Sequence, residues 1–480
     1  MAERHPKEHV ETEAWWALVL ASATSMVVGI AVTAVNVVFP AIERDFAGAS
    51  RSTLSWGITG YSIALASLML IGGRLADRLG RRRVFRVGVA IFVIASLILA
   101  LSPTAWVFVA ARLGQAVGAA LSGPASLSLV LERFPTSRRL SAIATWTGLG
   151  TLGAAVGPSF SAIVSQQFGW RWIFVLPLAV SLTSLALSAR LLPPGRPASV
   201  DGDRQRLDVI GSVLGTVGVA LLAAAITEGP RLGWSDPLIV ACIVGSLVLL
   251  PLFVRRSLRH PEPLLDVRLF SVPNVAAVNL VNIGLTAAGT ASWLLYPLFM
   301  VQHWGYSLIR TGLALTVFPV VASATGMVAS RIAERIGTRR VIAYGALLPA
   351  AGMLWQVFRL QDAPHYLSGI VPGAVLFNVG FGIIYAPVTA LALRSVTEAK
   401  LGQATAMLNS LRQLGGGLGV ATVIAIIGNA DVVPVETYHR AFVAVTVMAL
   451  ASGIVILTAL RVPAEYRTSR RTATETSPVP

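Results

Sequence analysis

Long apolar runs recur along the whole chain, and they constrain the fold more than any other feature. A helix crosses the hydrocarbon core of a bilayer with about 20 consecutive apolar residues, and fourteen stretches of the sequence reach roughly that length. Only 12% of the residues are charged, about half the fraction in soluble domains, and these charges lie between the runs. A large soluble helical protein would instead show amphipathic stripes with a charge every few residues. The sequence therefore predicts an all-α integral membrane protein.

The predicted spans are the apolar runs between breaks rich in charge, Pro or Gly. The first run is too long for a signal-peptide core and has no convincing cleavage site, so it is predicted to be a spanning helix. The spans are residues 15–40, 52–72, 84–103, 105–130, 141–165, 172–189, 208–227, 236–254, 273–301, 311–330, 341–359, 366–393, 401–428 and 441–460.

The basic residues fall unevenly on the predicted loops. With the N-terminus placed in the cytoplasm, the cytoplasmic loops and tails hold 29 of the 38 Lys and Arg residues, the outside loops hold 7, and Arg112 and Arg412 lie within spans. Because cytoplasmic loops are the ones enriched in Lys and Arg, both termini are predicted to be cytoplasmic, with the protein in the inner (plasma) membrane. The net charge of +16 is therefore interpreted as a result of the basic cytoplasmic loops, not as a sign of nucleic-acid binding.

One twelve-residue segment occurs twice, as GRLADRLGRRRV at 73–84 and SRIAERIGTRRV at 330–341, with seven identities at an offset of 257. Positive-inside bias would explain two basic loops, but not the matched acid and glycine at the same spacing. Six helices with short loops need roughly 190–220 residues at about 20 apolar residues per span, so the offset leaves room for one further helical pair. The sequence thus predicts two six-helix bundles, a known transporter architecture, plus two extra helices.

The predicted domains follow from this duplication. They are an N-tail at 1–14, an N-terminal six-helix bundle at 15–190, a cytoplasmic linker at 191–207, two additional helices at 208–254, a cytoplasmic loop at 255–272, a C-terminal six-helix bundle at 273–461 and a disordered cytoplasmic tail at 462–480.

The first copy of the repeated segment resembles the signature loop between helices 2 and 3 of the major facilitator superfamily. Asp77 beside several arginines can form an ion-pair latch that releases when the two halves move, and Gly73 allows close helix contact. A purely structural loop anchor is the alternative. The resemblance implies a gating role for Gly73, Asp77, Arg78, Gly80 and Arg81, and for Glu334 and Gly337 in the second copy.

Further motifs resemble the fourteen-helix drug:proton antiporter branch of that superfamily. Residues 111–119 read ARLGQAVGA, Trp170-Arg171-Trp172 precedes the sixth span, and the fifth carries a helix-packing set that includes a GxxxG pair and a bend-inducing proline. This set is Gly150, Gly153, Gly157 and Pro158. The resemblance implies a monomeric secondary transporter that exports a small organic or amphiphilic compound by proton antiport, through alternating access and without cofactor or metal.

One position departs from the branch pattern. The end of the first span matches it at Asn36, but Ala31 stands where the branch usually has an acid. With the spans predicted above, no Asp or Glu lies near the middle of any span. We therefore predict that protons are coupled through Asp77, Glu132 and Arg112.

Polar and aromatic residues inside apolar spans are predicted to line the substrate cavity, although such residues also serve as hydrogen bonds between helices. Because Arg412 lies near mid-bilayer with no acid in obvious reach, neutral or anionic substrates are expected to be favoured. In the alternative, Arg412 bonds helix carbonyls or snorkels and never meets substrate. The predicted cavity residues are Asn36, Tyr61, Arg112, Gln115, Asn279, Asn282, Tyr296, Asn378, Tyr385, Asn409, Arg412 and Gln413.

Other functions fit the sequence less well. The six histidines are scattered and no HExxH motif occurs, which argues against a membrane enzyme, and no P-loop is present for an ATP-driven pump. Cys242 is the single cysteine, so no intrachain disulfide can form. An importer, a uniporter, a channel or a non-transporting sensor with the same fold stays open.

Overall fold

The structure, a computed structural model, describes residues 12–191, 208–261, 263, 265–397, 400–429 and 433–461, and all regular secondary structure in these ranges is helical. The predicted all-α architecture is thereby confirmed. Most of the predicted N-tail, the linker from residue 192 and the C-terminal tail lie outside the described residues. The α-helices are α1 (Thr12–Asp45), α2 (Arg51–Leu79), α3 (Arg81–Ala100), α4 (Ala105–Arg133), α5 (Thr136–Phe168), α6 (Val175–Leu191), α7 (Val209–Leu232), α8 (Pro237–Arg259), α9 (Pro273–Leu298), α10 (Leu308–Ile336), α11 (Thr338–Arg359), α12 (Val371–Arg394), α13 (Leu401–Ile427) and α14 (Val435–Ala459).

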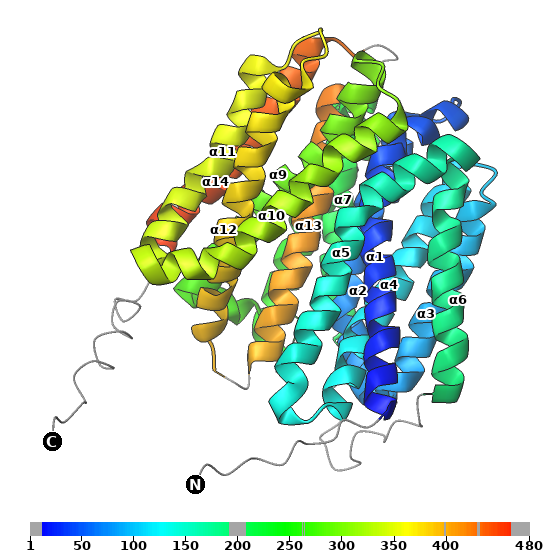
Figure 1. Ribbon diagram of the computed structural model, residues 1–480, viewed down its shortest axis with the longest axis vertical. Helices are drawn as coiled ribbons and strands as arrows, with labels where there is room; N and C mark the ends of the chain where they lie inside the picture. Colours follow the sequence, from blue (N-terminus) through cyan, green and yellow to red (C-terminus); the bar gives the residue numbers. More distant parts are fainter. Residues whose placement is uncertain are drawn as a thin grey trace, which may run out of the picture. The chain divides into compact units, whose positions relative to one another are not determined.

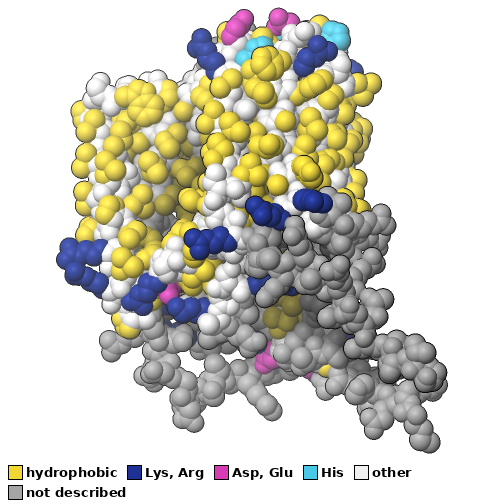
Figure 2. All heavy atoms as spheres, turned by 90° about the vertical axis from the view of Figure 1, so that its left-hand side faces the viewer, with side chains coloured by type: hydrophobic (Ala, Val, Ile, Leu, Met, Phe, Trp, Pro, Cys, Tyr) yellow, Lys and Arg dark blue, Asp and Glu magenta, His cyan; other side chains and the backbone are white. Residues whose placement is uncertain are grey.

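The helices agree in number and order with the predicted spans. Within the described residues, thirteen helices are long and apolar enough to cross a membrane. The remaining one, α2, contains the predicted span 52–72 and mixes Ser and Thr among its apolar residues. The face drawn in Figure 2 shows a band of hydrophobic side chains, with Lys and Arg gathered toward the ends.

Several predicted spans are shorter than the helices that contain them. The second span was expected to end at residue 72, but α2 continues to Leu79, and α5 begins at Thr136 instead of 141. Hydropathy marks only the part of a helix inside the hydrocarbon, whereas backbone hydrogen bonds continue the helix into polar residues beyond it.

Three predicted spans are not continuous α-helices. The span 172–189 begins in a 3-10 turn, η1 (Trp170–Phe174), before α6. The span 273–301 ends in a π-turn, η3 (Phe299–His303), and 366–393 starts with another, η4 (Tyr366–Ile370). Hydropathy cannot detect these changes, because they alter the backbone hydrogen bonds without altering composition. A further 3-10 turn, η2 (Val267–Ser271), precedes α9.

The chain divides into two compact units. Unit 1 comprises residues 1–266, 290–316 and 416–433, and unit 2 comprises residues 267–289, 317–415 and 434–480. Helices α9, α10 and α13 therefore contribute to both units. The predicted domain limits stay a prediction.

In unit 1, α1 packs along α5, and Figure 1 shows the two helices side by side with α4 and α6. The GxxxG pair of α5 faces α1: a Cβ at Gly153 would overlap the backbone of Met26, and one at Gly157 would overlap the Thr33 hydroxyl. Thr33 Oγ1 also donates to Ala154 O at 3.1 Å. These glycines let two backbones approach closely, which is a main source of helix association in a bilayer.

Helices α7 and α8, the pair predicted to be inserted between the bundles, are joined by an ion pair. Asp208 caps the N-terminus of α7 by accepting from Gly211 N at 2.9 Å, and Arg256 Nε at the end of α8 donates to it at 2.7 Å. Burial raises the pKa of Asp208, but these two hydrogen bonds and the charges of Arg256 and His260 outweigh burial and lower the pKa. The single cysteine, Cys242, is buried in this hairpin.

In unit 2, glycines again permit tight packing. A Cβ at Gly352 of α11 would overlap Gly373 O of α12, and a Cβ at Gly453 of α14 would lie 2.6 Å from Ala346 O of α11. His439 on α14 lies 2.9 Å from Leu360 O at the end of α11. The packing of α11, α12 and α14 thus rests on backbone approach, as that of α1 and α5 does.

The repeated segments share a backbone conformation. Gly80 separates α2 from α3 with φ 92° and ψ 129°, and Gly337, at the matching position, separates α10 from α11 with φ 92° and ψ 137°. This positive-φ region is open essentially to glycine alone. The match in sequence is therefore also a match in chain geometry.

Candidate functional site

Arg112 on α4 is fully buried, with 1% of its surface exposed. Its Nε donates to Gly57 O at 2.9 Å. Its Nη1 donates to Ala31 O at 3.3 Å and to Gln115 Oε1, and the guanidinium lies 4.1 Å from the centroid of the Tyr61 ring. Carbonyls, an amide and an aromatic face are the partners that make a buried charge tolerable. The structure thus brings together three predicted cavity residues, Arg112, Tyr61 and Gln115.

Ala31 occupies the position at which the family pattern leads us to expect an acid. Its side chain is buried and carries no charge, but its backbone carbonyl accepts a hydrogen bond from Arg112. The hydrogen bonds continue to α3, because Gln115 Nε2 donates to Ser96 Oγ at 3.0 Å. Arg112 therefore ties α4 to α1 and α2 with neutral partners.

Two of these neighbouring helices hold buried polar atoms without a hydrogen-bond partner among the described residues. These atoms are Ser22 Oγ and Asn36 Oδ1 on α1 and Thr59 Oγ1 and Tyr61 OH on α2, of which Asn36 and Tyr61 are predicted cavity residues. Asn36 Nδ2 donates within its own helix, to Val32 O at 3.4 Å. A buried polar atom costs free energy while it stays unpartnered, which makes these atoms candidates for contact with water or substrate.

The predicted proton-coupling residues are not gathered in one place. Arg112 and Glu132 both lie on α4, and 20 residues of helix separate them, which corresponds to about 30 Å. Glu132 instead pairs with Arg81 at 3.5 Å, and both side chains are partly exposed. The side chain of Asp77 lies outside the described residues. The coupling role of all three stays a prediction, and a path between Arg112 and Glu132 would need intermediate groups.

In the predicted gating loop, the structure describes Gly73, Gly80, Arg81, the exposed Arg78 and, in the second copy, Gly337, whereas the side chain of Glu334 lies outside the described residues. Gly73 was expected to allow close helix contact, but among the described residues a Cβ there would meet Pro124 Cβ alone, at an ordinary contact distance of 3.8 Å. The close approach occurs at Gly72, whose Cβ would overlap Ala120 O of α4. Adjacent residues on a helix point in different directions, so the sequence pattern assigned the contact to the wrong one. Arg81 also donates to Ser128 O at 3.2 Å, which holds the start of α3 against α4.

A polar network that the sequence did not predict joins helix ends within unit 1. We call Glu43, Arg51, Ser52, Glu228, Gln302 and Asn429 the Glu43 network. Glu43 at the end of α1 pairs with Arg51 at the start of α2, and their side chains are 13% and 7% exposed. Gln302 Nε2 of η3 donates to the second carboxylate oxygen of Glu43 at 2.9 Å.

The same network reaches α13 and α7. Arg51 Nη1 donates to Gly428 O at 3.0 Å, and Ser52 N donates to Asn429 Oδ1 at 3.2 Å. Ser52 Oγ donates to Glu228 of α7 at 3.0 Å. The members are too far apart in sequence to form a motif. The one available signal was a basic residue, Arg51, placed near an acid on a side of the membrane predicted to hold few basic residues.

In unit 2, Arg412 on α13 is half-buried and donates to the hydroxyl of Tyr385 on α12. Tyr385 continues a ladder of stacked rings, with centroids 5.4 Å from Phe381 and a further 6.3 Å from Phe381 to Phe377. The structure thus brings together the predicted cavity residues Arg412 and Tyr385, and it places Phe381 and Phe377 in line with the Tyr385 ring.

The remaining predicted cavity residues have fewer described contacts. Asn279 and Asn378 are buried and donate within their own helices, to Val275 O and Ala374 O, both at 2.8 Å. Asn282 and, in unit 1, Tyr296 are buried, whereas Asn409 and Gln413 are half-buried. Whether they meet substrate stays a prediction. In the described part of the chain, no group of three or more His, Cys, Asp or Glu side chains could hold a metal ion.

The comparison that decides the family covers nearly the whole chain. A model of the Major Facilitator Superfamily matches residues 21–278 and 278–480. The chain belongs to the Major Facilitator Superfamily. It is therefore a multi-pass membrane transporter, in agreement with its apolar helices.

Relatives within the Major Facilitator Superfamily match along most of their length. The cephamycin export protein CmcT of Amycolatopsis lactamdurans is 32% identical over 472 residues, 96% of this chain and 95% of that protein. The puromycin resistance protein pur8 of Streptomyces alboniger is 33% identical over 463 residues, 93% of this chain and 90% of that protein.

Solved structures share the fold. A POT family transporter in complex with 5-aminolevulinic acid matches with a TM-score of 0.70 at 16% identity, over 95% of this chain and 97% of that one. The D-xylose-proton symporter matches with a TM-score of 0.66 at 14% identity, over 93% of this chain and 98% of that one. These likenesses concern the fold and carry no substrate over.

Proposed function

We propose that this protein exports a small organic, drug-like compound across the inner membrane by proton antiport. The full-length similarity to proteins named for cephamycin export and puromycin resistance supports export of an antibiotic-like molecule. The basic bias of the loops, with 29 Lys and Arg against 7, supports cytoplasmic termini. The exporter is proposed to act as a monomer, since each chain carries both six-helix repeats.

The observation that carries the substrate proposal is the Arg412 side chain with its aromatic ladder. Binding pockets for drug-sized molecules combine apolar and aromatic walls with a few well-placed polar groups. Phe377, Phe381 and Tyr385 provide the aromatic wall, and the half-buried guanidinium provides the polar group. Because Arg412 is described with a phenol partner and no ion pair to an acid, an anionic or neutral amphiphile is favoured over a lipophilic cation.

The test is uptake into everted membrane vesicles with an imposed pH gradient. The probes are a cephamycin, which carries a carboxylate, and the lipophilic cation tetraphenylphosphonium. We expect uptake of the cephamycin that stops when the gradient is collapsed, with Arg412→Ala reducing uptake roughly tenfold or more and Arg412→Lys keeping part of it. The matched control is Arg310→Ala, which removes an arginine stacked 3.8 Å from a tyrosine centroid outside the aromatic ladder and should leave uptake unchanged.

Two results would refute parts of this proposal separately. Accumulation that persists after the pH gradient is collapsed would remove proton coupling. Efficient transport of the cation, unaffected by Arg412→Ala, would remove the substrate preference while leaving the exporter assignment intact.

The Glu43 network supports an alternating-access cycle, because closing one end of a transporter requires contacts that can break. Its bonds join the ends of α1, α2, α7 and α13 with η3, and the basic-residue count assigns these ends to the outside. A cross-link between Glu43→Cys and Gln302→Cys, in a chain whose Cys242 is replaced by Ser, should then stop transport until it is reduced. Undiminished transport in the cross-linked protein would remove this gating role.

A further inference from the structure

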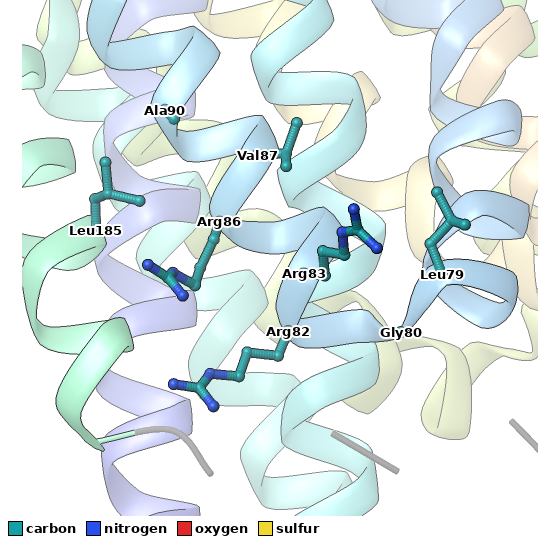
Figure 3. A pocket seen from close by; sticks show the side chains of 8 residues that line it. All are labelled: Leu79, Gly80, Arg82, Arg83, Arg86, Val87, Ala90 and Leu185. Carbon is teal, nitrogen blue, oxygen red and sulfur yellow. The ribbon is translucent and has the colours of Figure 1, made fainter. Parts of the chain in front are cut away.

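A second site lies where α3 begins, apart from the residues assigned to substrate. It is a surface pocket of about 610 Å³ between the end of α2, the start of α3 and α6. Figure 3 shows Arg82 and Arg86 directed toward the α6 side of the pocket and Arg83 toward Leu79. Its lining residues are Leu79, Gly80, Arg82, Arg83, Arg86, Val87, Ala90 and Leu185. The pocket thus combines three cations with apolar walls, and none of the described residues that line it is acidic.

The positive charge of this pocket is not balanced by the contacts that the structure describes. Arg82 Nη2 donates to Ala189 O of α6 at 2.9 Å, a neutral partner, and Arg82 Nε is buried without a hydrogen-bond partner among the described residues. Arg86 and Arg133 lie close enough to Arg82 to repel its charge. Like charges held together without a counter-charge are unfavourable, so an anion bound here would stabilise the arrangement.

The apolar residues of the pocket indicate what kind of anion fits. Leu79 and Val87 are 53% and 47% exposed, and exposed apolar residues continue along the membrane-spanning parts of α3 and α6 at Ile94 and Leu182. Val87, Ile94 and Leu182 lie in spans, where the surrounding solvent is lipid. A ligand with an anionic head and apolar tails would meet both parts at once.

We propose that this pocket binds the phosphate headgroup of an anionic phospholipid from the surrounding bilayer, with its acyl chains along α3 and α6. Basic pockets between spanning helices at the cytoplasmic surface favour such headgroups. Arginine suits phosphate because its planar guanidinium offers paired donors. The site is separate from the Arg412 ladder, so the proposal does not depend on what is exported.

The test measures lipid retention by the purified full-length protein. Protein in detergent is incubated with an equimolar mixture of dioleoyl phosphatidylglycerol and dioleoyl phosphatidylcholine, and the lipids that stay bound are counted by native mass spectrometry. We expect preferential retention of phosphatidylglycerol. Neutralising Arg82→Gln and Arg86→Gln together should reduce that preference by roughly fivefold per arginine.

The chain offers a matched control for general loss of positive charge. Arg255 and Arg259 line another shallow surface pocket, whose lining residues all lie on the single helix α8. Arg255→Gln with Arg259→Gln removes the same charge from a site without a second wall and should keep the preference for phosphatidylglycerol. Equal effects of the two double variants would show a non-specific surface effect and would overturn the proposal.

Further outcomes would also overturn it. Absence of any preference in the unmodified protein would do so. Displacement of bound phosphatidylglycerol by millimolar inorganic phosphate would assign the site to small anions instead of lipid.

Discussion

Two arginines within predicted spans, Arg112 in unit 1 and Arg412 in unit 2, have opposite surroundings. Arg112 is fully buried and its donors reach two backbone carbonyls, one amide oxygen and a tyrosine face. Arg412 is half-buried, and its described bond goes to one phenol beside a stack of aromatic rings. The position of a charge in a span therefore does not by itself indicate its role. A side chain whose hydrogen-bonding capacity is largely used inside its own bundle holds helices together, whereas one with spare capacity can bind a ligand.

The largest expected effect is loss of folded protein on replacing Arg112. Arg112→Ala would leave Gly57 O, Ala31 O and Gln115 Oε1 without this donor, and each buried acceptor left without a partner costs about 1–3 kcal/mol. Thermal unfolding can be followed with a thiol-reactive fluorogenic dye, because the one cysteine, Cys242, is buried. The unfolding midpoint of Arg112→Lys should lie between those of the unmodified protein and Arg112→Ala, since a lysine keeps the charge but not the fork of donors. An unfolding midpoint unchanged in Arg112→Ala would remove the contrast between the two arginines.

A smaller effect is expected from their tyrosine neighbours. Tyr385→Phe removes the hydroxyl that accepts from Arg412 and should lower kcat/KM for the exported probe roughly tenfold, the value of a hydrogen bond to a charged group. Tyr61→Phe removes a hydroxyl without a hydrogen-bond partner among the described residues, while keeping the ring beneath Arg112. We expect Tyr61→Phe to change the unfolding free energy by less than about 0.5 kcal/mol. The reverse ranking, with Tyr61→Phe the more damaging for transport, would place the substrate in unit 1.

An effect weaker than loss of the Arg412–Tyr385 bond is expected from the ion pair between Arg256 and Asp208. Asn caps helices about as well as Asp, so Asp208→Asn removes mainly the charge and should cost about 1 kcal/mol at pH 7. Because the pKa of Asp208 is lowered in the folded protein, its ionised form contributes stability above the unfolded pKa of about 3.9, and this contribution is lost as the pH falls through the folded pKa.

The difference in unfolding free energy between the unmodified protein and Asp208→Asn should therefore shrink below about pH 4. Intrinsic tryptophan fluorescence during thermal unfolding at a series of pH values measures it. A difference that is constant from pH 7 to pH 3 would mean that the ion pair contributes nothing and that Asp208 acts only as a cap.

The features that the sequence predicted are those with local or periodic signals. Apolar length predicted the helices, because a bilayer sets one length for all of them. The repeat at 73–84 and 330–341 predicted an internal duplication, and the structure adds that its two glycines share one backbone conformation. The buried Arg112 was recognisable because charges within spans are rare.

The features that the sequence could not predict depend on contacts between distant segments. Gln302 meets Glu43 across 259 positions of sequence, and neither residue belongs to a pattern. The close helix approach is at Gly72 and not at Gly73 because of the way α2 is rotated about its axis. Two adjacent glycines in the sequence give no information about that rotation. Likewise the π-turn η3, which carries Gln302, changes hydrogen bonding without changing composition.

Gly80 and Gly337 place an unusual restriction on the gene. Both adopt a backbone conformation that a side chain with a Cβ rarely enters. Any single-base change of a glycine codon that alters the residue introduces at least a Cβ, so no one-step substitution at either position preserves the junction. The two junctions therefore cannot diverge gradually as the loops around them have done. In a duplicated half, that restriction keeps a shared mark of ancestry after the surrounding residues have changed.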